Sequence, residues 1–298
     1  MTTFSGVIVP MVTPFNRDER QTINYEVAEQ LIDRLVSAGA SGIFVFGSNG
    51  EFHLVGHKEK VDFSRHVIEY VRGRVPVYVG TGSCSTYEAC ELSREAEALG
   101  ASALSVINPY FMGITSREIE SYYEDVSASV KIPIILYNIP KSTGMNLPAG
   151  IVAKLAPIDN IRGIKDSSGD MDNLASYVRA ARGHDMDVLV GSDGKISEAY
   201  ELGASGTIAG TANLICDVVV TLWNALKRGD TTAVTRLQAD IEPLRDVLHL
   251  GSTPSMLKRS LELAGVPVGP ARRPVGEVPA GLDDSIRVML DHYGIAHA

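Results

Sequence analysis

The sequence predicts a closed (β/α)8 (TIM) barrel followed by a C-terminal helical extension, and three observations support this fold class. Eight short apolar runs recur up to about residue 211, each run is continuous rather than alternating, and amphipathic stretches separate them. Continuous apolar runs are typical of parallel strands buried on both faces. Strand–helix alternation repeated in this way is the layout of a barrel of about 250 residues. An open doubly wound sheet is the main alternative, and it is disfavoured because no Gly-x-Gly-x-x-Gly motif follows the first run.

The apolar runs set the positions of the expected strands, which are residues 7–13, 42–46, 76–80, 103–107, 133–137, 161–165, 187–191 and 205–209. Between several of them, apolar residues recur at helical spacing, as Val27, Leu31 and Leu35 do in the first stretch. The helices expected within the barrel are residues 25–38, 58–72, 87–99, 117–129, 171–182 and 195–202. Several end in a glycine or small-residue turn, which favours helix termination there.

The chain beyond the last strand is expected to be helical at 217–228, 231–249, 254–264 and 282–293. We therefore predict two parts: a catalytic barrel over residues 1–215 and a helical extension over residues 216–298 that packs on it. Such an appendage is more often a packing or oligomer surface than a second functional domain.

Composition excludes several classes of protein. Of the 298 residues, 45% are hydrophobic and 21% charged, so a large core is expected and global disorder is not. A formal net charge of −9 argues against a nucleic-acid partner, which needs clustered cations. No apolar run approaches the roughly 18 residues of a membrane helix, and the first residues lack the features of a signal peptide. Cys84, Cys90 and Cys216 show no metal-binding spacing, so we expect reduced thiols in a cytoplasmic protein.

Lys165 is the first candidate functional residue. It ends the apolar run 161–164 and is followed by small polar turn residues. In a (β/α)8 barrel the carboxyl ends of the strands meet at the face that carries the chemistry, so this amine is expected there. The plain alternative is a strand-end lysine that reaches solvent or pairs with Asp166.

Other polar groups are expected at the same face. The turn Gly47-Ser48-Asn49-Gly50-Glu51 follows the second strand, and its amides and hydroxyl could hold a carboxylate. Ser48 and Glu51 also have the spacing of a helix capping box, and both interpretations stay open. Tyr137 ends the fifth strand, from which its hydroxyl could carry protons. Tyr110 follows the fourth strand, either as an aromatic lip or as ordinary packing.

These residue types favour covalent catalysis on a 2-oxo acid. A lysine is nucleophilic only as the neutral amine, and desolvation among apolar barrel walls favours that form. The amine attacks the keto carbon, and the resulting iminium accepts electrons when the next carbon–carbon bond is made or broken. Small residues at 191–194 and 206–211 leave room for a ligand beside the lysine.

Three motifs carry a resemblance to a known family: G-S/T-x-G-E at Gly47 to Glu51, Y-N-x-P at Tyr137 to Pro140, and G-I/L-K-D/E at Gly163 to Asp166. Their order and spacing resemble the dihydrodipicolinate synthase / N-acetylneuraminate lyase family of pyruvate-dependent class I aldolases and lyases. The resemblance covers residues 5 to 211 and extends into the helical tail.

The resemblance implies roles for individual residues. Lys165 would form the Schiff base with the substrate, and Tyr137 would shuttle protons beside it. Ser48 and the amide of Asn49 would bind the carboxylate of pyruvate, and Ile208 would line the pocket. The resemblance also implies a homotetramer built as a dimer of dimers, with neither a metal nor an organic cofactor.

Two departures from the synthase branch bear on the substrate. Phe111 stands where a neighbouring subunit would supply a relay tyrosine, with Tyr110 just before it. Ser142 stands where synthases carry an arginine for the second substrate's carboxylate. Because a hydroxyl cannot form that bidentate ion pair, lysine biosynthesis is disfavoured.

The sequence therefore predicts a lyase that cleaves a 4-hydroxy-2-oxo acid or 2-keto-3-deoxy sugar acid to pyruvate and an aldehyde. A sugar-acid dehydratase acting through the same iminium and a dihydrodipicolinate synthase are the enzymatic alternatives. A catalytically silent barrel that only binds a 2-oxo acid is the alternative of a different class, and the intact Lys165 and Tyr137 argue against it.

Overall fold

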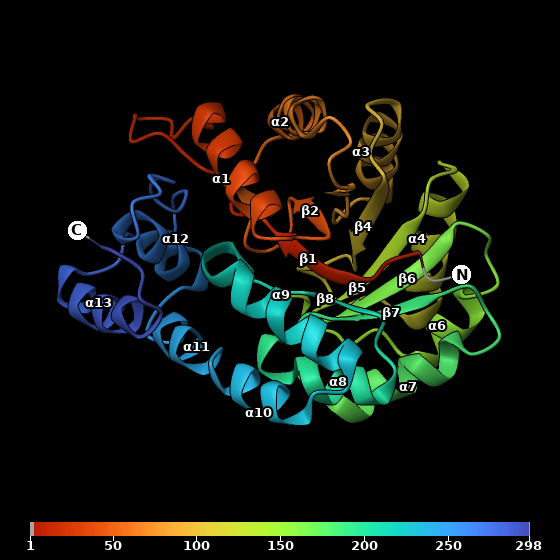
Figure 1. The fold of residues 1–298 in the computed structure, drawn as a ribbon. Coiled ribbons are helices and arrows are strands. Elements are labelled where there is room, and N and C mark those ends of the chain that lie inside the picture. The colour runs from red at the N-terminus through yellow and green to blue at the C-terminus, as the bar shows by residue number, and fades with distance from the viewer. Residues whose placement is uncertain (1–2, 298) are drawn as a thin grey trace.

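The computed structural model describes residues 3–297, in which eight parallel strands form a closed barrel in sequence order (Figure 1). Each strand pairs with the next along the chain, and the last pairs with the first. The strands are β1 (Gly6–Pro10), β2 (Gly42–Val45), β3 (Val77–Gly80), β4 (Ala103–Ile107), β5 (Ile134–Asn138), β6 (Ile161–Asp166), β7 (Asp187–Val190) and β8 (Gly206–Ile208). The predicted fold class is confirmed.

The strands lie where the apolar runs place them, but the first is shorter than expected. It ends at Pro10 instead of residue 13. Two residues later, the Val12 amide donates to Oδ1 of Asn213 at 3.0 Å and not to a neighbouring strand. A buried side chain from far along the chain therefore ends the sheet pairing here.

The barrel helices follow the predicted pattern with two additions. They are α1 (Tyr25–Ser37), α2 (His57–Val71), α3 (Thr86–Ala98), α4 (Ser116–Ala128), α5 (Pro140–Thr143), α6 (Ala149–Leu155), α7 (Met171–Ala181) and α8 (Ile196–Leu202), with short 3-10 helices at Phe52–Leu54 and Asp193–Lys195; another 3-10 helix, Ala280–Leu282, precedes α13 of the C-terminal extension. Polar N-caps start several of them; the side chain of Asn24, for example, accepts the Val27 amide at 3.1 Å. Helices α5 and α6, which the sequence analysis missed, span 4 and 7 residues and are too short to show a periodic apolar pattern.

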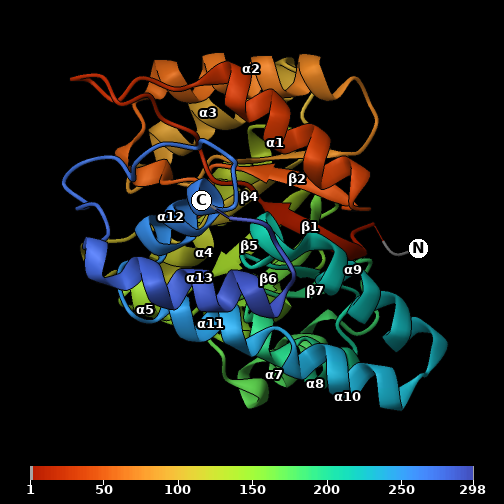
Figure 2. The same cartoon turned by 60° about the vertical axis from the view of Figure 1, so that its left-hand side comes forward.

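The C-terminal extension consists of α9 (Ala212–Arg228), α10 (Thr231–Ala239), α11 (Glu242–Leu248), α12 (Thr253–Leu263) and α13 (Asp283–His292). Helices α11, α12 and α13 pack against one another at one side of the barrel (Figure 2). Within residues 3–297, no helix combines the length and the apolar character that crossing a membrane requires.

The single helix expected at 231–249 is in fact two, α10 and α11. Pro243 lies in the first turn of α11. Since proline has no amide hydrogen to donate, it is tolerated at a helix start and not in a helix interior. The expected division after residue 215 falls inside α9, where Ile215 has non-helical backbone angles. That division stays a prediction.

The barrel interior holds a compact apolar layer. Its members alternate with residues that face the surrounding helices, and they are Phe4, Ile8, Phe44, Tyr78, Ala103, Ile135, Leu189 and Ile208. Successive side chains of a strand point to opposite faces. Ile135 in this layer therefore places Tyr137, two residues on, inside the barrel mouth.

Candidate active site

Lys165 and Tyr137 are neighbours across two adjacent strands. The register between β5 and β6 pairs these two residues directly. Lys165 Nζ lies 4.0 Å from the centre of the Tyr137 ring and 5.5 Å from that of Phe44. Both Lys165 and Tyr137 are buried, with 4% and 3% of their surface exposed. The structure thus brings the predicted amine and phenol into contact inside the barrel.

Asp166 does not pair with Lys165, although an ion pair between them was one form of the plain alternative. Its Oδ1 accepts hydrogen bonds from Asn138 Nδ2 at 2.9 Å and from the Ser168 amide at 3.1 Å. Its Oδ2 accepts from the Ser168 hydroxyl at 2.8 Å. Asp166 thereby anchors the loop after β6, and within the described chain Lys165 forms no salt bridge.

The turn after β2 brings Ser48 to the same place. The oxygens of the Ser48 and Tyr137 hydroxyls are 3.1 Å apart, which is hydrogen-bond distance. The alternative capping box does not form, because Glu51 adopts a left-handed conformation with φ of 54° and its side chain caps no helix. Ser48 is therefore a partner of the phenol.

Glu51 instead anchors the turn to the C-terminal extension. Its Oε1 lies 2.5 Å from Lys258 Nζ, and its Oε2 accepts the Arg272 amide at 2.7 Å. Lys258 also donates to the Pro270 carbonyl at 3.0 Å. Burial lowers the pKa of Lys258 to about 8, although the charge of Glu51 acts in the opposite direction. This buried pair joins α12 to the turn at residues 47–51.

A cavity of about 640 Å³ surrounds the lysine at the barrel mouth, within the usual size range of small-molecule sites. Six of the predicted site residues line it: Lys165, Tyr137, Ser48, Asn49, Ser142 and Ile208. Ser142 is exposed in α5, the short helix that follows β5, whereas Ile208 is buried at the end of β8. The predicted site residues are therefore gathered around one space, with one exception.

The exception is Tyr110, which does not line this cavity. Its ring packs edge-on against Phe52 with the ring centres 5.7 Å apart, and its carbonyl accepts from Cys84 Sγ. Burial raises the pKa of its phenol to about 12. Within one chain Tyr110 is a packing residue, and its neighbour Phe111 is 92% exposed.

The C-terminal extension also lines the cavity, which the sequence analysis did not anticipate. Arg245 of α11, His249 just after it and Thr253 at the start of α12 all face this space. An amphipathic helix pattern shows which face is apolar but not which distant pocket its polar residues reach. The only hint of this arrangement in the sequence was the spacing of Arg245 and His249, which are four positions apart and therefore on one face of a helix.

Asp193 is another cavity residue that the sequence analysis did not identify. It is buried on the loop after β7, and its Oδ2 accepts the Thr211 amide at 2.7 Å. Burial raises the pKa of this carboxyl, while the hydrogen bond from Thr211 opposes the shift. The carboxyl lines the cavity close to Lys165 and Arg245.

Because its pKa is raised in the folded protein, Asp193 makes stability depend on pH. The folded state holds the proton more tightly than the unfolded chain, so this contribution to the free energy of unfolding falls as pH rises above about 4. The Asp193→Asn variant lacks the effect. Its stability relative to wild type should rise with pH from about 4 and then level off once the wild-type carboxyl has lost its proton. Urea unfolding between pH 4 and 8 measures this, with the exposed Asp217→Asn as the control; a flat difference would contradict the assignment.

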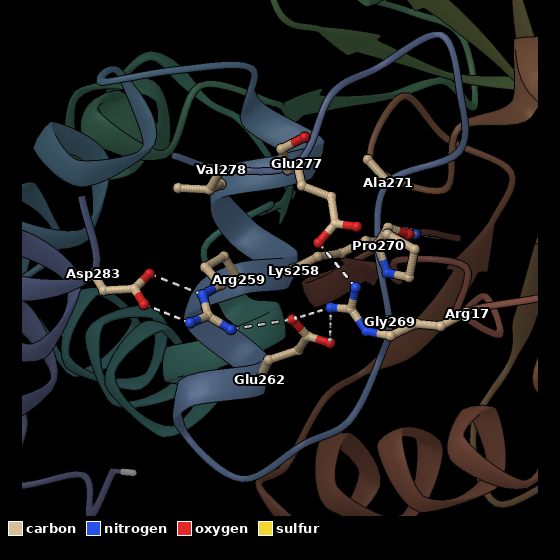
Figure 3. Close-up of a pocket in the computed structure, with 11 residues that line it drawn as sticks. Arg17, Lys258, Arg259, Glu262, Gly269, Pro270, Ala271, Glu277, Val278 and Asp283 are labelled. Carbon is tan, nitrogen blue, oxygen red and sulfur yellow. Dashed lines mark hydrogen bonds and ion pairs between the residues drawn. The ribbon is translucent and has the colours of Figure 1, made fainter. Parts of the chain in front are cut away.

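A second cavity of about 200 Å³ lies on the far side of Lys258, between α12 and the segment 269–278 (Figure 3). Arg17 forms ion pairs with Glu262 and Glu277, both at 2.9 Å, and Arg259 pairs with Asp283. The charges around this cavity compensate one another, so they fasten the extension to the barrel.

The described residues contain no group of three or more His, Cys, Asp or Glu side chains arranged to hold a metal. The cavity side chains offer two amines, one phenol, two imidazoles, two carboxyls and several hydroxyls as reactive groups. That the reaction needs no cofactor stays a prediction from the resemblance.

Comparison with known proteins gives relatives along the whole chain. The model of the dihydrodipicolinate synthetase family matches residues 3–292. A 4-hydroxy-tetrahydrodipicolinate synthase of Methanoculleus marisnigri is 32% identical over 98% of this chain and 100% of its own. The probable 2-dehydro-3-deoxy-D-pentonate aldolase YjhH of Escherichia coli K12 is 33% identical over 99% of each chain.

A solved structure agrees with the barrel described above. The crystal structure of YagE, a prophage protein of Escherichia coli K12 in complex with pyruvate, superposes with a TM-score of 0.94 at 30% identity. The match covers 99% of this chain and 100% of that one. Motifs, barrel and whole-length matches agree, and the chain belongs to the dihydrodipicolinate synthetase family.

Proposed function

We propose that this enzyme is a class I aldolase that cleaves a 4-hydroxy-2-oxo acid or 2-keto-3-deoxy sugar acid to pyruvate and an aldehyde through a Schiff base on Lys165. The observation that carries the proposal is the contact of the buried Lys165 amine with Tyr137, whose hydroxyl is in turn 3.1 Å from Ser48. Relatives named synthase and aldolase, and the pyruvate complex of YagE, support pyruvate as the common reactant.

The first half of the reaction forms the electron sink. The Lys165 amine attacks C2 of the substrate, and loss of water leaves an iminium. The Ser48 hydroxyl and the Asn49 amide bind the carboxylate next to that carbon. Ile208, buried at the end of β8, keeps this part of the cavity apolar. Exclusion of water strengthens each electrostatic contact with the iminium.

The second half breaks the carbon–carbon bond. Tyr137 gives its phenol proton to the water that leaves when the iminium forms, and the phenolate then takes the proton from the C4 hydroxyl, with Ser48 as its hydrogen-bond partner. The C3–C4 bond breaks, the aldehyde leaves, and the electron pair neutralises the iminium to an enamine. Protonation at C3 and hydrolysis then release pyruvate and the free lysine.

Product analysis separates the four interpretations. An aldolase given 2-keto-3-deoxy sugar acids releases pyruvate and aldehyde in equal amounts. A dehydratase instead forms a product one water lighter and no pyruvate, and a silent barrel leaves the substrate unchanged. Condensation of pyruvate with aspartate semialdehyde at a biosynthetic rate would favour the synthase and contradict the argument from Ser142.

We expect Tyr137→Phe to lower kcat by about 10²-fold, the usual effect of removing a positioned proton carrier. The lysine and its carboxylate partners stay in place, so borohydride should still trap pyruvate on Lys165. Tyr87→Phe is the matched control, because Tyr87 is 72% exposed and only contacts Glu91. Unchanged kcat in Tyr137→Phe would remove the phenol from the mechanism.

We also infer a homotetramer, as the resemblance implies. Phe111 and Met112 form an apolar tip that is 92% and 66% exposed, and exposed apolar residues next to each other favour a protein contact. Sedimentation velocity of wild type and of Phe111→Ser tests whether this tip contributes to assembly.

We also expect an enzyme that needs no metal and is located in the cytoplasm. The iminium supplies the electron sink, so dialysis against a chelator should leave activity unchanged. The cysteines at 84, 90 and 216 are free thiols, which supports the expected cytoplasmic location.

A further inference from the structure

Two glycines that line the cavity, Gly191 and Gly210, and a third next to the lining residue Asp193 make room for three polar side chains. None of them has a positive φ, so their backbone conformation does not require glycine. A Cβ added at Gly191 would lie 2.7 Å from Cε of Lys165, and one at Gly210 would lie 2.6 Å from Nδ2 of Asn49. Both neighbours belong to the proposed site. A side chain at either glycine would therefore displace a residue of the proposed site.

The third glycine makes room for Arg245. A Cβ on Gly194 would lie 1.9 Å from Nη1 and 2.5 Å from Cζ of this arginine. The guanidinium, carried by α11 of the C-terminal extension, thus lies directly against the loop after β7. It is built into the site in the same way as Lys165 and Asn49.

The hydrogen bonds of Arg245 leave one edge of its guanidinium unused. Both carboxylate oxygens of Glu242 accept from the same nitrogen, Nη1, at 2.8 and 2.7 Å. Over residues 3–297, nothing accepts a hydrogen bond from Nε or Nη2. The Nε–Nη2 edge is a fork that suits a carboxylate or phosphate bound through two oxygens.

The charge around the cavity favours an anion. Lys165, Lys141 and Arg245 line it, against the carboxylates of Glu51 and Asp193. Glu51 is already neutralised by Lys258. Glu242 in turn pairs with Arg245, which leaves Lys141 and Lys165, once its nitrogen is the charged iminium, against Asp193 in a chain with a net charge of −9. Arg245, Asp193 and Lys165 line the same cavity, so the arginine shares one space with the proposed reacting centre.

We propose that Arg245 binds a second anionic group, a carboxylate or phosphate ester, at the end of the substrate remote from the 2-oxo acid. This inference rests on the proposed aldolase function and names its substrate class. The 2-oxo acid end lies at Ser48 and Asn49, and the chain of the substrate runs past Lys165 toward α11. The aldehyde released by C3–C4 cleavage is therefore itself an anion.

A matched series of three-carbon aldehydes tests the inference in the condensation direction. Glyceraldehyde, glyceraldehyde 3-phosphate and tartronate semialdehyde each carry a hydroxyl next to the aldehyde and differ in the remote group. With pyruvate, we expect kcat/KM to be about tenfold or more higher for an anionic aldehyde than for glyceraldehyde. The preferred anion identifies phosphate or carboxylate as the source.

Variants assign the preference to the arginine. Arg245→Met should reduce the ratio of anionic to neutral kcat/KM to near one, mainly through the loss of kcat/KM for the anionic aldehydes. Gly194→Ala should act in the same direction, because the added Cβ displaces the guanidinium. Arg236→Met is the control, since Arg236 is an exposed residue of α10 paired with Asp240. Borohydride trapping of pyruvate on Lys165 shows that each variant is folded.

Each failure has a distinct meaning. Equal kcat/KM for all three aldehydes overturns the inference and leaves the aldolase function intact. A preference for anions that survives Arg245→Met overturns the assignment to this residue. If aspartate semialdehyde is preferred over the whole series, Arg245 keeps its role and the synthase replaces the aldolase. No condensation with any aldehyde overturns both proposals.

Discussion

Replacing Lys165 by methionine should abolish the pyruvate adduct and lower the aldolase rate by at least ~10⁴-fold, as expected when the covalent nucleophile is lost. Methionine keeps the length and much of the apolar volume of the lysine stem, so the barrel mouth stays packed. The measurement is borohydride reduction in the presence of pyruvate, followed by peptide mass spectrometry. A reduced adduct on Lys165 in wild type and none in the variant is the expected result.

Two other lysines enter the design of this experiment, one as a competing adduct site and one as a control. Lys141 also lines the cavity, so the peptide map must distinguish an adduct on it from one on Lys165. Lys154→Met is the activity control, because Lys154 is an exposed residue paired with Glu120 at 2.7 Å. If wild type forms no adduct at any lysine, the aldolase, dehydratase and synthase interpretations all fail together.

Replacing Lys258 by methionine should destabilise the fold by about 3–5 kcal/mol, the cost of leaving a buried charge without its partner. Lys258 and Glu51 are 1% and 0% exposed, so water cannot compensate the carboxylate. Because Glu51 ends the turn that carries Ser48 and Asn49, the KM for pyruvate should rise as well. Urea unfolding and steady-state kinetics on the same preparation measure both effects.

A double-mutant cycle separates the pair from its surroundings. Adding Glu51→Gln to Lys258→Met removes the uncompensated charge and should restore part of the lost stability, since neutral replacement of a buried pair is often tolerated. Lys58→Met is the control; its ion pair with Asp62 is on the surface and should contribute under ~1 kcal/mol. Equal losses in both lysine variants would show that burial of the Lys258 pair is unimportant.

Local patterns in the sequence were sufficient to predict the positions of the barrel strands. Each apolar run was continuous over a few residues, and such runs become buried parallel strands wherever helices cover the sheet. The pattern was insufficient where the deciding group lay elsewhere. β1 stops at Pro10 because Asn213 binds the Val12 amide, and α10 separates from α11 at Pro243.

The sequence also predicted which groups meet at the barrel mouth, because the ends of parallel strands share one face. Lys165, Tyr137 and Ser48 lie there together. It did not show that the Ser48 hydroxyl would turn to Tyr137 while Glu51 turned away to Lys258. A local S-x-x-E pattern allows either arrangement, and the distant partner decides between them.

By itself, then, the sequence determined the barrel, the position of Lys165 at its mouth and the family to which the chain belongs. The tertiary structure alone decided that the C-terminal extension takes part in the site, through Arg245 against Gly194 and Lys258 against Glu51. The physical reason is the range of the interactions. Strand and helix periodicity is written within a few neighbouring residues, whereas the placement of a charge depends on which residues far along the chain surround it after folding.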